Sequence, residues 1–482
     1  MLETELKLYG TRILKMRYNK LHNKYILADI LSAILVWVLF IVFRKAINNI
    51  SIINEIEFFV FKPKYYLTFA FFPFTVLLIH YLSGFYIKIE NCNRLGLILN
   101  TLLSSIIISL VVFMFLMLDD INISNNYYFV SLSTLFLVFF TTTLYLRTAV
   151  YNQILRLYKT KEWTINTLIV GHGPNAERIE KDLTKNSDRH SVVGFVSAEN
   201  TRPTIAGEKI CGHFNQISNI IEKNNIEEVI IALDNPDEQK LFSYINTLYK
   251  HNVEIRFTPR LYEILIGSAR MGNAGFQPLV SITEVQMPNW QIAVKRLIDV
   301  IASAIMLIVL LPVFIYFAIA IKLNSKGSVF YLQERIGRYG KPFNIVKFRT
   351  MYVDAENGTP KLSSATDERV TSIGRILRMY RIDELPQFWN ILKGEMSIVG
   401  PRPERKYYIN QIIEDAPYYC LLYKIRPGLT SWGPIKIGYS DTIEKMIERL
   451  NYDIIYMENM SLLNDLRILI LTSEILFKGK GV

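Results

Sequence analysis

The 482-residue sequence is poor in cysteine, and several familiar patterns are missing from it. Its three cysteines, Cys92, Cys211 and Cys420, stand far apart, which excludes a disulfide framework and a cysteine metal cluster. Residues 1–24 are polar and basic, so no cleavable signal peptide is expected. The net charge of +11 comes without a helix-turn-helix or zinc-finger pattern, which argues against a nucleic-acid partner.

Apolar residues are abundant: 51% of the chain is hydrophobic and 13% aromatic. Four apolar stretches are each long enough to cross a hydrocarbon core of about 30 Å as a helix. They are Tyr25–Phe43, Tyr65–Ile87, Leu95–Leu118 and Tyr127–Leu146. The sequence therefore predicts a membrane α-helical N-terminal bundle of four transmembrane helices over residues 1–160, the alternative being buried core helices.

The distribution of basic residues predicts the orientation of this bundle. Six lysines and arginines precede the first stretch, Arg147 and Arg156 begin a basic run at the end of the fourth, and the 119–126 loop has none. By the positive-inside rule both ends of the bundle face the cytoplasm. Its four predicted spans make the protein multi-pass. The loop from Arg44 to Lys64 holds four basic residues and weakens this prediction.

Residues 161–290 alternate between short buried strands and helical segments, which predicts a Rossmann-like α/β domain. The expected strands are at 166–170, 191–196, 227–232 and 253–257. Gly171 and Gly173 form a possible nucleotide loop after the first strand. The second strand ends at Ser197 without an acid for a ribose, and only Glu199 is near, so NAD is unlikely. A structural or oligomerising role and the sensing of a small ligand both stay open.

The apolar segment Leu297–Leu323 is long enough to span a membrane, but Pro312 near its centre is expected to break the helix. Basic residues flank it on both sides, with Lys295 before and Lys322 after, which favours both ends on one face. We therefore expect a re-entrant membrane helix-break-helix over residues 291–324, the alternative being a straight fifth span. Asp299 is expected to be an interfacial cap or a partner of Lys295 or Arg296.

Two adjacent carboxylates, Asp383 and Glu384, precede Pro386, a residue suited to the first turn of a helix. The two carboxylates of such a pair can take different roles. One can attack phosphorus or hold Mg²⁺, while the other adjusts the reactivity of the first or transfers a proton. The reaction then needs cations for the phosphoryl oxygens, and five arginines lie nearby in sequence: Arg375, Arg378, Arg381, Arg402 and Arg426. The alternative is a capped helix start whose arginines are solvated.

Five motifs occur in the same order over about 90 residues and together resemble the bacterial polyprenyl-phosphate sugar-1-phosphate transferases, or monotopic phosphoglycosyl transferases. The resemblance over nearly the whole chain is to their large, exopolysaccharide-initiating branch. The motifs are Lys341–Met351, Ile373–Arg378, Asp383–Asn390, Met396–Pro403 and Arg426–Thr430.

The resemblance implies a mixed α/β monotopic catalytic domain over residues 325–482, on the cytoplasmic face of the bacterial inner membrane. It implies that Asp383 attacks the β-phosphorus of a UDP-sugar, that UMP leaves and that a polyprenyl phosphate, expected to be undecaprenyl phosphate, takes the sugar phosphate. Mg²⁺ would lie on the diphosphate with Asp383 as a ligand, and Glu384 would assist. Phosphate or nucleotide contacts are expected from Lys347, Arg349, Arg375, Arg378, Arg381, Pro401, Arg402, Pro403, Glu404 and Arg426, the two prolines serving shape.

The run Thr430-Ser-Trp-Gly-Pro434 departs from the family's usual Gly-Trp-Ala-Gln, which leaves the sugar open. Helical segments are expected at 441–458 and 461–477. Membrane lipids are expected partners, and the Rossmann-like domain could hold a homodimer together. A dehydratase or epimerase would need a Tyr-x-x-x-Lys pair, which does not occur in this chain. A catalytically dead scaffold is a further alternative, against which the intact Asp383 and Glu384 argue.

Overall fold

The computed structural model describes residues 12–47, 63–87, 89, 93–117, 125–186, 189–198, 209–234, 238–251, 253–258, 280–281, 287–353, 355, 367–438 and 442–477. The chain divides into two compact units. Residues 15–163 and 288–294 form one, and the rest of the chain forms the other. Glu199, Cys92 and most of the two extramembrane loops used to predict orientation lie outside the described residues.

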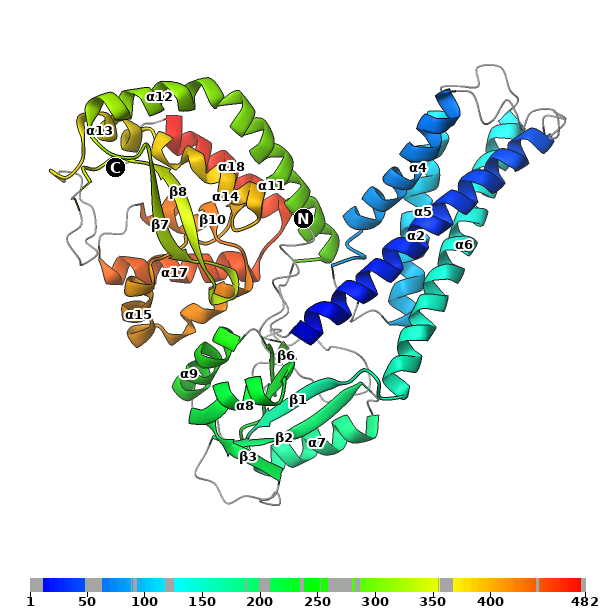
Figure 1. Cartoon of the computed structure of the whole chain (residues 1–482), viewed down its shortest axis with the longest axis horizontal. Helices are drawn as coiled ribbons and strands as arrows, with labels where there is room; N and C mark the ends of the chain where they lie inside the picture. The colour runs from blue at the N-terminus through cyan, green and yellow to red at the C-terminus, as the bar shows by residue number, and fades with distance from the viewer. Residues whose placement is uncertain are drawn as a thin grey trace. The chain divides into compact units, whose positions relative to one another are not determined.

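The first unit contains four helices, α2 (Arg12–Ile47), α4 (Pro63–Leu82), α5 (Arg94–Met117) and α6 (Asn125–Lys159) (Figure 1). Among the described residues, three of them hold segments long and apolar enough to cross a membrane: Asn19–Phe40, Arg94–Met114 and Tyr128–Lys159. The apolar segment of α4 is shorter, Phe71–Leu82, and the helix contains Pro73. The described part of this unit therefore has three to four apolar helices, as in a membrane protein, and the fourth span predicted from the sequence corresponds to the shorter apolar segment of α4.

Inside this unit the apolar helices enclose a fully buried ion pair. Asp29 on α2 accepts two hydrogen bonds from Arg147 on α6, at 2.7 and 2.8 Å. Tyr86 donates to the same carboxylate at 2.5 Å, and Arg147 also donates to Thr101 on α5 at 3.0 Å. Charges are costly in an apolar interior unless they are paired and hydrogen-bonded, and this pair meets that condition.

The α/β domain follows from Thr164. Its elements are β1 (Ile165–Val170), α7 (Pro174–Asn186), β2 (His190–Ser197), β3 (Ile210–His213), η4 (Phe214–Gln216), α8 (Ile217–Lys223), β4 (Glu228–Ile231), α9 (Glu238–Leu248), η5 (Tyr249–His251), β5 (Glu254–Phe257) and β6 (Val280–Ser281). The sheet order is β3-β2-β1-β4-β5-β6, with only β6 antiparallel. This is the strand order of a Rossmann-type sheet, as the sequence predicted.

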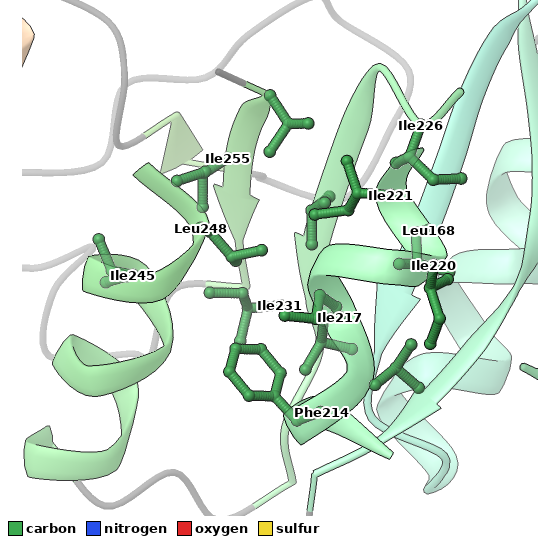
Figure 2. Packing of buried hydrophobic residues seen from close by; sticks show 14 of the residues in the cluster. Leu168, Phe214, Ile217, Ile220, Ile221, Ile226, Ile231, Ile245, Leu248 and Ile255 are labelled. Atoms are coloured by element: carbon green, nitrogen blue, oxygen red, sulfur yellow. The ribbon is translucent and has the colours of Figure 1, made fainter. Parts of the chain in front are cut away.

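The strands are apolar because both faces of a parallel sheet are covered. On one face, Ile217, Ile220 and Ile221 of α8 pack with Leu168 and other strand residues, as Figure 2 shows. On the other face, Ala176, Ile179 and Leu183 of α7 pack against the sheet. Cys420, from the C-terminal half of the chain, completes the first cluster, and Asn246 donates to the carbonyl of Pro417 at 2.8 Å.

Two helices, α11 (Asn289–Val309) and α12 (Leu311–Asn324), form the segment expected to be re-entrant. They meet at a bend of 58°, and Pro312 lies in the first turn of α12. Its missing N–H costs little there, since the first turn has no internal acceptor for it. Asp299 is buried and accepts a hydrogen bond from the backbone N–H of Ile398 at 3.0 Å, whereas Lys295 pairs with Asp465. Asp299 therefore stabilises the fold of the domain.

The C-terminal domain combines a hairpin, a short parallel pair of strands and surrounding helices. The hairpin is β7 (Phe330–Ile336) and β8 (Pro342–Phe348), joined through η6 (Arg338–Gly340), and the pair is β9 (Ser397–Val399) with β10 (Gly428–Thr430). The remaining elements are α13 (Ser372–Met379), η7 (Ile382–Gln387), α14 (Phe388–Lys393), α15 (Lys406–Asp415), η8 (Pro417–Lys424), α16 (Trp432–Ile437), α17 (Ile443–Glu458) and α18 (Leu462–Phe477).

Candidate active site

The two carboxylates lie on the short 3-10 helix η7, which packs beside β8. The residue before η7, Arg381, has a left-handed backbone conformation with φ of 53°, which is uncommon for a residue with a side chain. Such a conformation persists only where the surroundings hold it in place, and it is frequent at functional sites. Here it turns the chain sharply from α13 into η7, so that Asp383 and Glu384 follow at once.

Glu384 is buried and surrounded by cations from three parts of the sequence. Lys347 on β8 donates to its Oε1 at 2.9 Å, and Arg381 and Arg402 each lie 3.6 Å from a carboxylate oxygen. Burial alone would raise the pKa of Glu384, but the charges of the three cations outweigh it and hold that pKa well below its ordinary value. Glu384 is therefore ionised throughout the physiological range.

Asp383 has a different environment, although it is the neighbouring residue. Within the described part of the chain, its carboxylate makes no hydrogen bond and no ion pair. Burial, and then the negative charge of Glu384, raise the pKa of Asp383 to about 6, against the opposing charges of Lys347 and Arg378. Two adjacent carboxylates whose pKa values are pushed apart can take different chemical roles. The carboxylate oxygens of Glu384 are held by ion pairs, whereas those of Asp383 make no such contact with the described residues.

The segment Pro401–Glu404 brings a cation to this site from the other side. Pro401 and Pro403 are buried, and the carbonyl of Pro401 accepts from the N–H of Gly428 at 2.8 Å. The rings of the two prolines fix the backbone on each side of Arg402, whose guanidinium reaches Glu384. The loop thus holds a cation at the carboxylate pair with little loss of conformational entropy on ordering.

Glu404 is in a different network from the one expected for a phosphate contact. It is buried and forms ion pairs with Arg335 on β7, at 3.2 Å, and with Arg449 on α17. Burial would raise its pKa, but Arg449 and Arg335 hold the pKa of Glu404 below its ordinary value. The structure therefore places Glu404 where it ties the segment Pro401–Glu404 to two neighbouring elements.

The other expected arginines are distributed between the site and its supports. Arg378 donates to Thr350 Oγ1 at 3.0 Å, and its charge acts on Asp383. Arg375 is exposed on α13. Arg349 donates to the carbonyls of Ser325 and Lys326 at 2.8 and 2.9 Å, and Arg426 donates to the carbonyl of Gly394 at 3.0 Å. The structure thus gathers Lys347, Arg378, Arg381 and Arg402 at the carboxylates, and it places Arg349 and Arg426 on backbone carbonyls.

Sequence reasoning missed three residues that hold the site: Arg335, Arg449 and Asp453. Burial raises the pKa of Asp453 to about 6, against the charge of Arg449 and hydrogen bonds from Ser431 and the backbone of Arg402. The side chain of Arg449 crosses Gly433 so closely that a Cβ there would lie 2.1 Å from its Cγ. In the sequence, Gly433 within the unusual run Thr430–Pro434 could have indicated this contact, because a residue with a side chain would leave no room for the arginine.

The residues present fit a magnesium ion that is shared with a substrate. Among the described residues, no group of three or more histidine, cysteine, aspartate or glutamate side chains could enclose a metal. Mg²⁺, however, is usually held by one or two carboxylates together with substrate phosphates. Asp383, with uncommitted oxygens beside a cluster of cations, suits that arrangement.

Comparison with known proteins gives two family matches. Residues 290–479 match the family model described as bacterial sugar transferase, and residues 83–259 match the one described as CoA-binding domain. The first match covers nearly all of α11, then α12 and the described elements of the C-terminal domain, and the second runs from before α5 to the end of β5.

Three curated relatives illustrate the similarity. The UDP-glucose:undecaprenyl-phosphate glucose-1-phosphate transferase of Klebsiella pneumoniae is 34% identical over 56% of this chain and 58% of its own length. The UDP-N-acetylgalactosamine-undecaprenyl-phosphate N-acetylgalactosaminephosphotransferase of Aeromonas hydrophila is 36% identical over 39% of this chain and 44% of its own. This chain thus spans about half the length of these two relatives.

A third relative is matched over most of its length. The putative undecaprenyl-phosphate N-acetylgalactosaminyl 1-phosphate transferase of Bacillus subtilis (strain 168) is 41% identical over 29% of this chain and 79% of its own length. The expected motifs, the C-terminal domain with its carboxylate pair and these similarities agree, and the chain belongs to the bacterial sugar transferase family.

Proposed function

We propose that this chain transfers a sugar-1-phosphate from a UDP-sugar to a polyprenyl phosphate, and so begins the synthesis of an exopolysaccharide, capsule or O-antigen type glycan. The observation that carries the proposal is the unequal carboxylate pair. Asp383 has free oxygens and a pKa raised to about 6, whereas Glu384 is ion-paired to Lys347, Arg381 and Arg402. This arrangement provides a nucleophile next to a fixed cluster of positive charge.

The reaction has two displacements at the same phosphorus. In the first, an oxygen of Asp383 forms a bond to the β-phosphorus, the bond from that phosphorus to the bridging oxygen breaks, and UMP leaves with the electron pair. In the second, a phosphate oxygen of the polyprenyl phosphate attacks, and the carboxylate of Asp383 is released. The product is a polyprenyl diphosphate sugar, and the enzyme returns to its starting state.

The cations at Glu384 contribute by stabilising charge. Lys347 and Arg402 are held by a carboxylate that remains ionised, so they are already oriented when a diphosphate arrives. Mg²⁺, when bound at Asp383 and the diphosphate, would supply further neutralisation of the phosphoryl oxygens. Arg378, close enough for its charge to act on Asp383, favours the ionised form that the attack requires.

The lipid acceptor fits the bent helix pair. A re-entrant arrangement of α11 and α12, with both ends on the cytoplasmic face of the inner membrane, would hold the domain at the level of the lipid head groups. The exposed apolar side chains of Ile305, Ile308 and Leu311 lie close to the bend in sequence, as such an insertion requires. The polyprenyl phosphate would then reach Asp383 from the leaflet, and the donor from the cytoplasm.

The test is UMP release from a panel of UDP-sugars by the purified protein in nanodiscs with Mg²⁺ and undecaprenyl phosphate. We expect release with at least one donor, its loss in Asp383→Asn, and a slow residual reaction in Glu384→Gln. Asp415→Asn, which changes an exposed acid on α15, serves as the matched control and should keep full activity. Wild-type activity in Asp383→Asn would show that Asp383 is not the nucleophile.

Absence of UMP with every donor would favour the alternative of a catalytically dead scaffold. A second measurement separates that case from the use of a wrong acceptor lipid, because the first displacement needs no acceptor. Incubation with a UDP-sugar labelled in its sugar, without acceptor, should leave label on the wild-type protein and none on Asp383→Asn. The reason is that the intermediate is a phosphosugar ester of that side chain.

A further inference from the structure

The α/β domain has the strand order of dinucleotide-binding proteins, so the place where a phosphate would bind can be located. In a sheet of order 3-2-1-4-5-6, the ligand crevice lies at the carboxyl ends of the strands where the order reverses, between β1 and β4. The glycine turn after β1 approaches the diphosphate, and the N-terminus of the following helix provides N–H donors. In this chain that turn is Gly171–Gly173 and that helix is α7.

Both glycines of the turn are packed against the residues that follow β4. Gly171 has φ of +123°, and a Cβ there would lie 2.4 Å from the carbonyl oxygen of Ala232. A Cβ on Gly173 would lie 1.7 Å from Oδ2 of Asp234. The lack of side chains at these positions therefore makes room for the protein's own chain, namely the segment Ala232–Asp234.

The carboxylate of Asp234 also takes a hydrogen bond that a phosphate would use. Pro174 begins α7 and has no N–H, so the first backbone donor of the helix is that of Asn175. That N–H donates to Oδ1 of Asp234 at 3.0 Å, and the side chain of Asn175 donates to the carbonyl of Leu233 at 3.3 Å. A negative charge at a helix N-terminus is stabilised by the helix dipole, and Asp234 supplies that charge here.

We infer that Asp234 is the resident anion of this glycine turn, and that the α/β domain of this chain does not take the diphosphate of a dinucleotide or of coenzyme A at that place. A bound diphosphate would have to displace the segment Ala232–Asp234 and would meet a carboxylate at the start of α7. The inference departs from the family description as a CoA-binding domain, and it is independent of the transferase activity proposed above.

Equilibrium dialysis of the full-length protein in nanodiscs tests the inference directly. Radiolabelled coenzyme A and NAD would be used at millimolar concentration, with excess UDP present to occupy a nucleotide site in the transferase domain. We expect no saturable binding of either compound to the wild-type protein. Saturable binding that persists in excess UDP and is reduced by Gly173→Ala would overturn the inference.

A second measurement tests whether Asp234 occupies an anion site. Asp234→Ala should lower the melting temperature of the protein in nanodiscs, and added inorganic sulfate should raise it by several degrees more than it raises that of wild type. Asp234→Asn, which keeps an oxygen acceptor, should lose less. Glu222→Ala removes an exposed carboxylate from α8 of the same domain and should change neither quantity. An equal response to sulfate in wild type and Asp234→Ala would refute the assignment.

Discussion

Lys347 Nζ lies 2.9 Å from Oε1 of Glu384, although 37 residues separate them in the sequence. The contact joins β8 to η7 and fixes the more buried of the two adjacent carboxylates as an anion. Because Glu384 is committed to its cations, the charge that it holds acts on its neighbour and contributes to the raised pKa of Asp383. One ion pair thus makes two neighbouring acids chemically unequal.

The first prediction concerns the pH dependence of the proposed transfer. A nucleophilic carboxylate must be ionised, so kcat/KM should rise with pH through about 6, the raised pKa of Asp383, and level off above it. Lys347 lowers that pKa, so Lys347→Met should move the acid limb of the profile upward by roughly 1 pH unit. UMP release measured over a pH series checks both statements.

Two results would contradict this prediction. An acid limb near the ordinary aspartate value would mean that Asp383 is not the titrating nucleophile. A limb that stays in place in Lys347→Met, while the rate at its plateau falls, would mean that Lys347 contacts the substrate without acting on Asp383.

The second prediction concerns the buried network of Glu404. Glu404→Gln removes one charge and leaves Arg335 and Arg449 buried without their partner, a change that typically costs about 3–5 kcal/mol. We expect a lower melting temperature, and reduced activity because the loop carrying Arg402 loses an anchor. Glu448→Gln, at an exposed position of α17, is the matched control. A fully stable Glu404→Gln with an altered KM for the donor would instead assign Glu404 to the substrate.

The sequence predicted the elements whose patterns are local. The strands at 166–170 and 191–196 and the break near Pro312 follow from apolar runs, turn residues and a proline. It also predicted the Rossmann-type sheet. The carboxylate pair itself is adjacent in the chain, so it was visible without any knowledge of the fold.

The supports of the site could not be predicted, because they depend on contacts between distant segments. Arg449 reaches Glu404 across 45 residues, and nothing in the pattern of α17 distinguishes it from a surface arginine. Arg349 follows an apolar strand in a motif shared with the family, yet it donates to the carbonyls of Ser325 and Lys326. Likewise, the carboxylate of Asp234, which follows β4, occupies the glycine turn that follows β1.

The third prediction follows from the position of Arg349. Its guanidinium donates to the carbonyls of Ser325 and Lys326 and to the hydroxyl of Ser325, which fixes the chain just after α12. A lysine cannot satisfy these acceptors together, so Arg349→Lys should lose about 1–3 kcal/mol of stability. The same change at the exposed Arg375 should have little effect on stability. If Arg349→Lys melts like wild type and raises only the KM for the donor, the residue binds substrate as the family resemblance implied.

The fourth prediction concerns the ion pair inside the membrane helices. Arg147→Met leaves Asp29 buried without its cation, which should destabilise the unit by about 3–5 kcal/mol. The double variant Asp29→Asn with Arg147→Met removes both charges and should recover part of this loss. Arg156→Met, at an exposed position of α6, is the control.

Thermal unfolding in nanodiscs, followed on Arg147→Met, on Asp29→Asn, on the double variant and on the control, measures this coupling. The pair links α2 to α6, and Arg147 also donates to Thr101 on α5, so its loss removes hydrogen bonds that join three helices. Recovery in the double variant is expected because an uncompensated buried charge costs more than a missing pair. If the double variant is as unstable as the sum of its single changes, the two residues do not stabilise each other, and the packing of this unit depends on its apolar contacts alone.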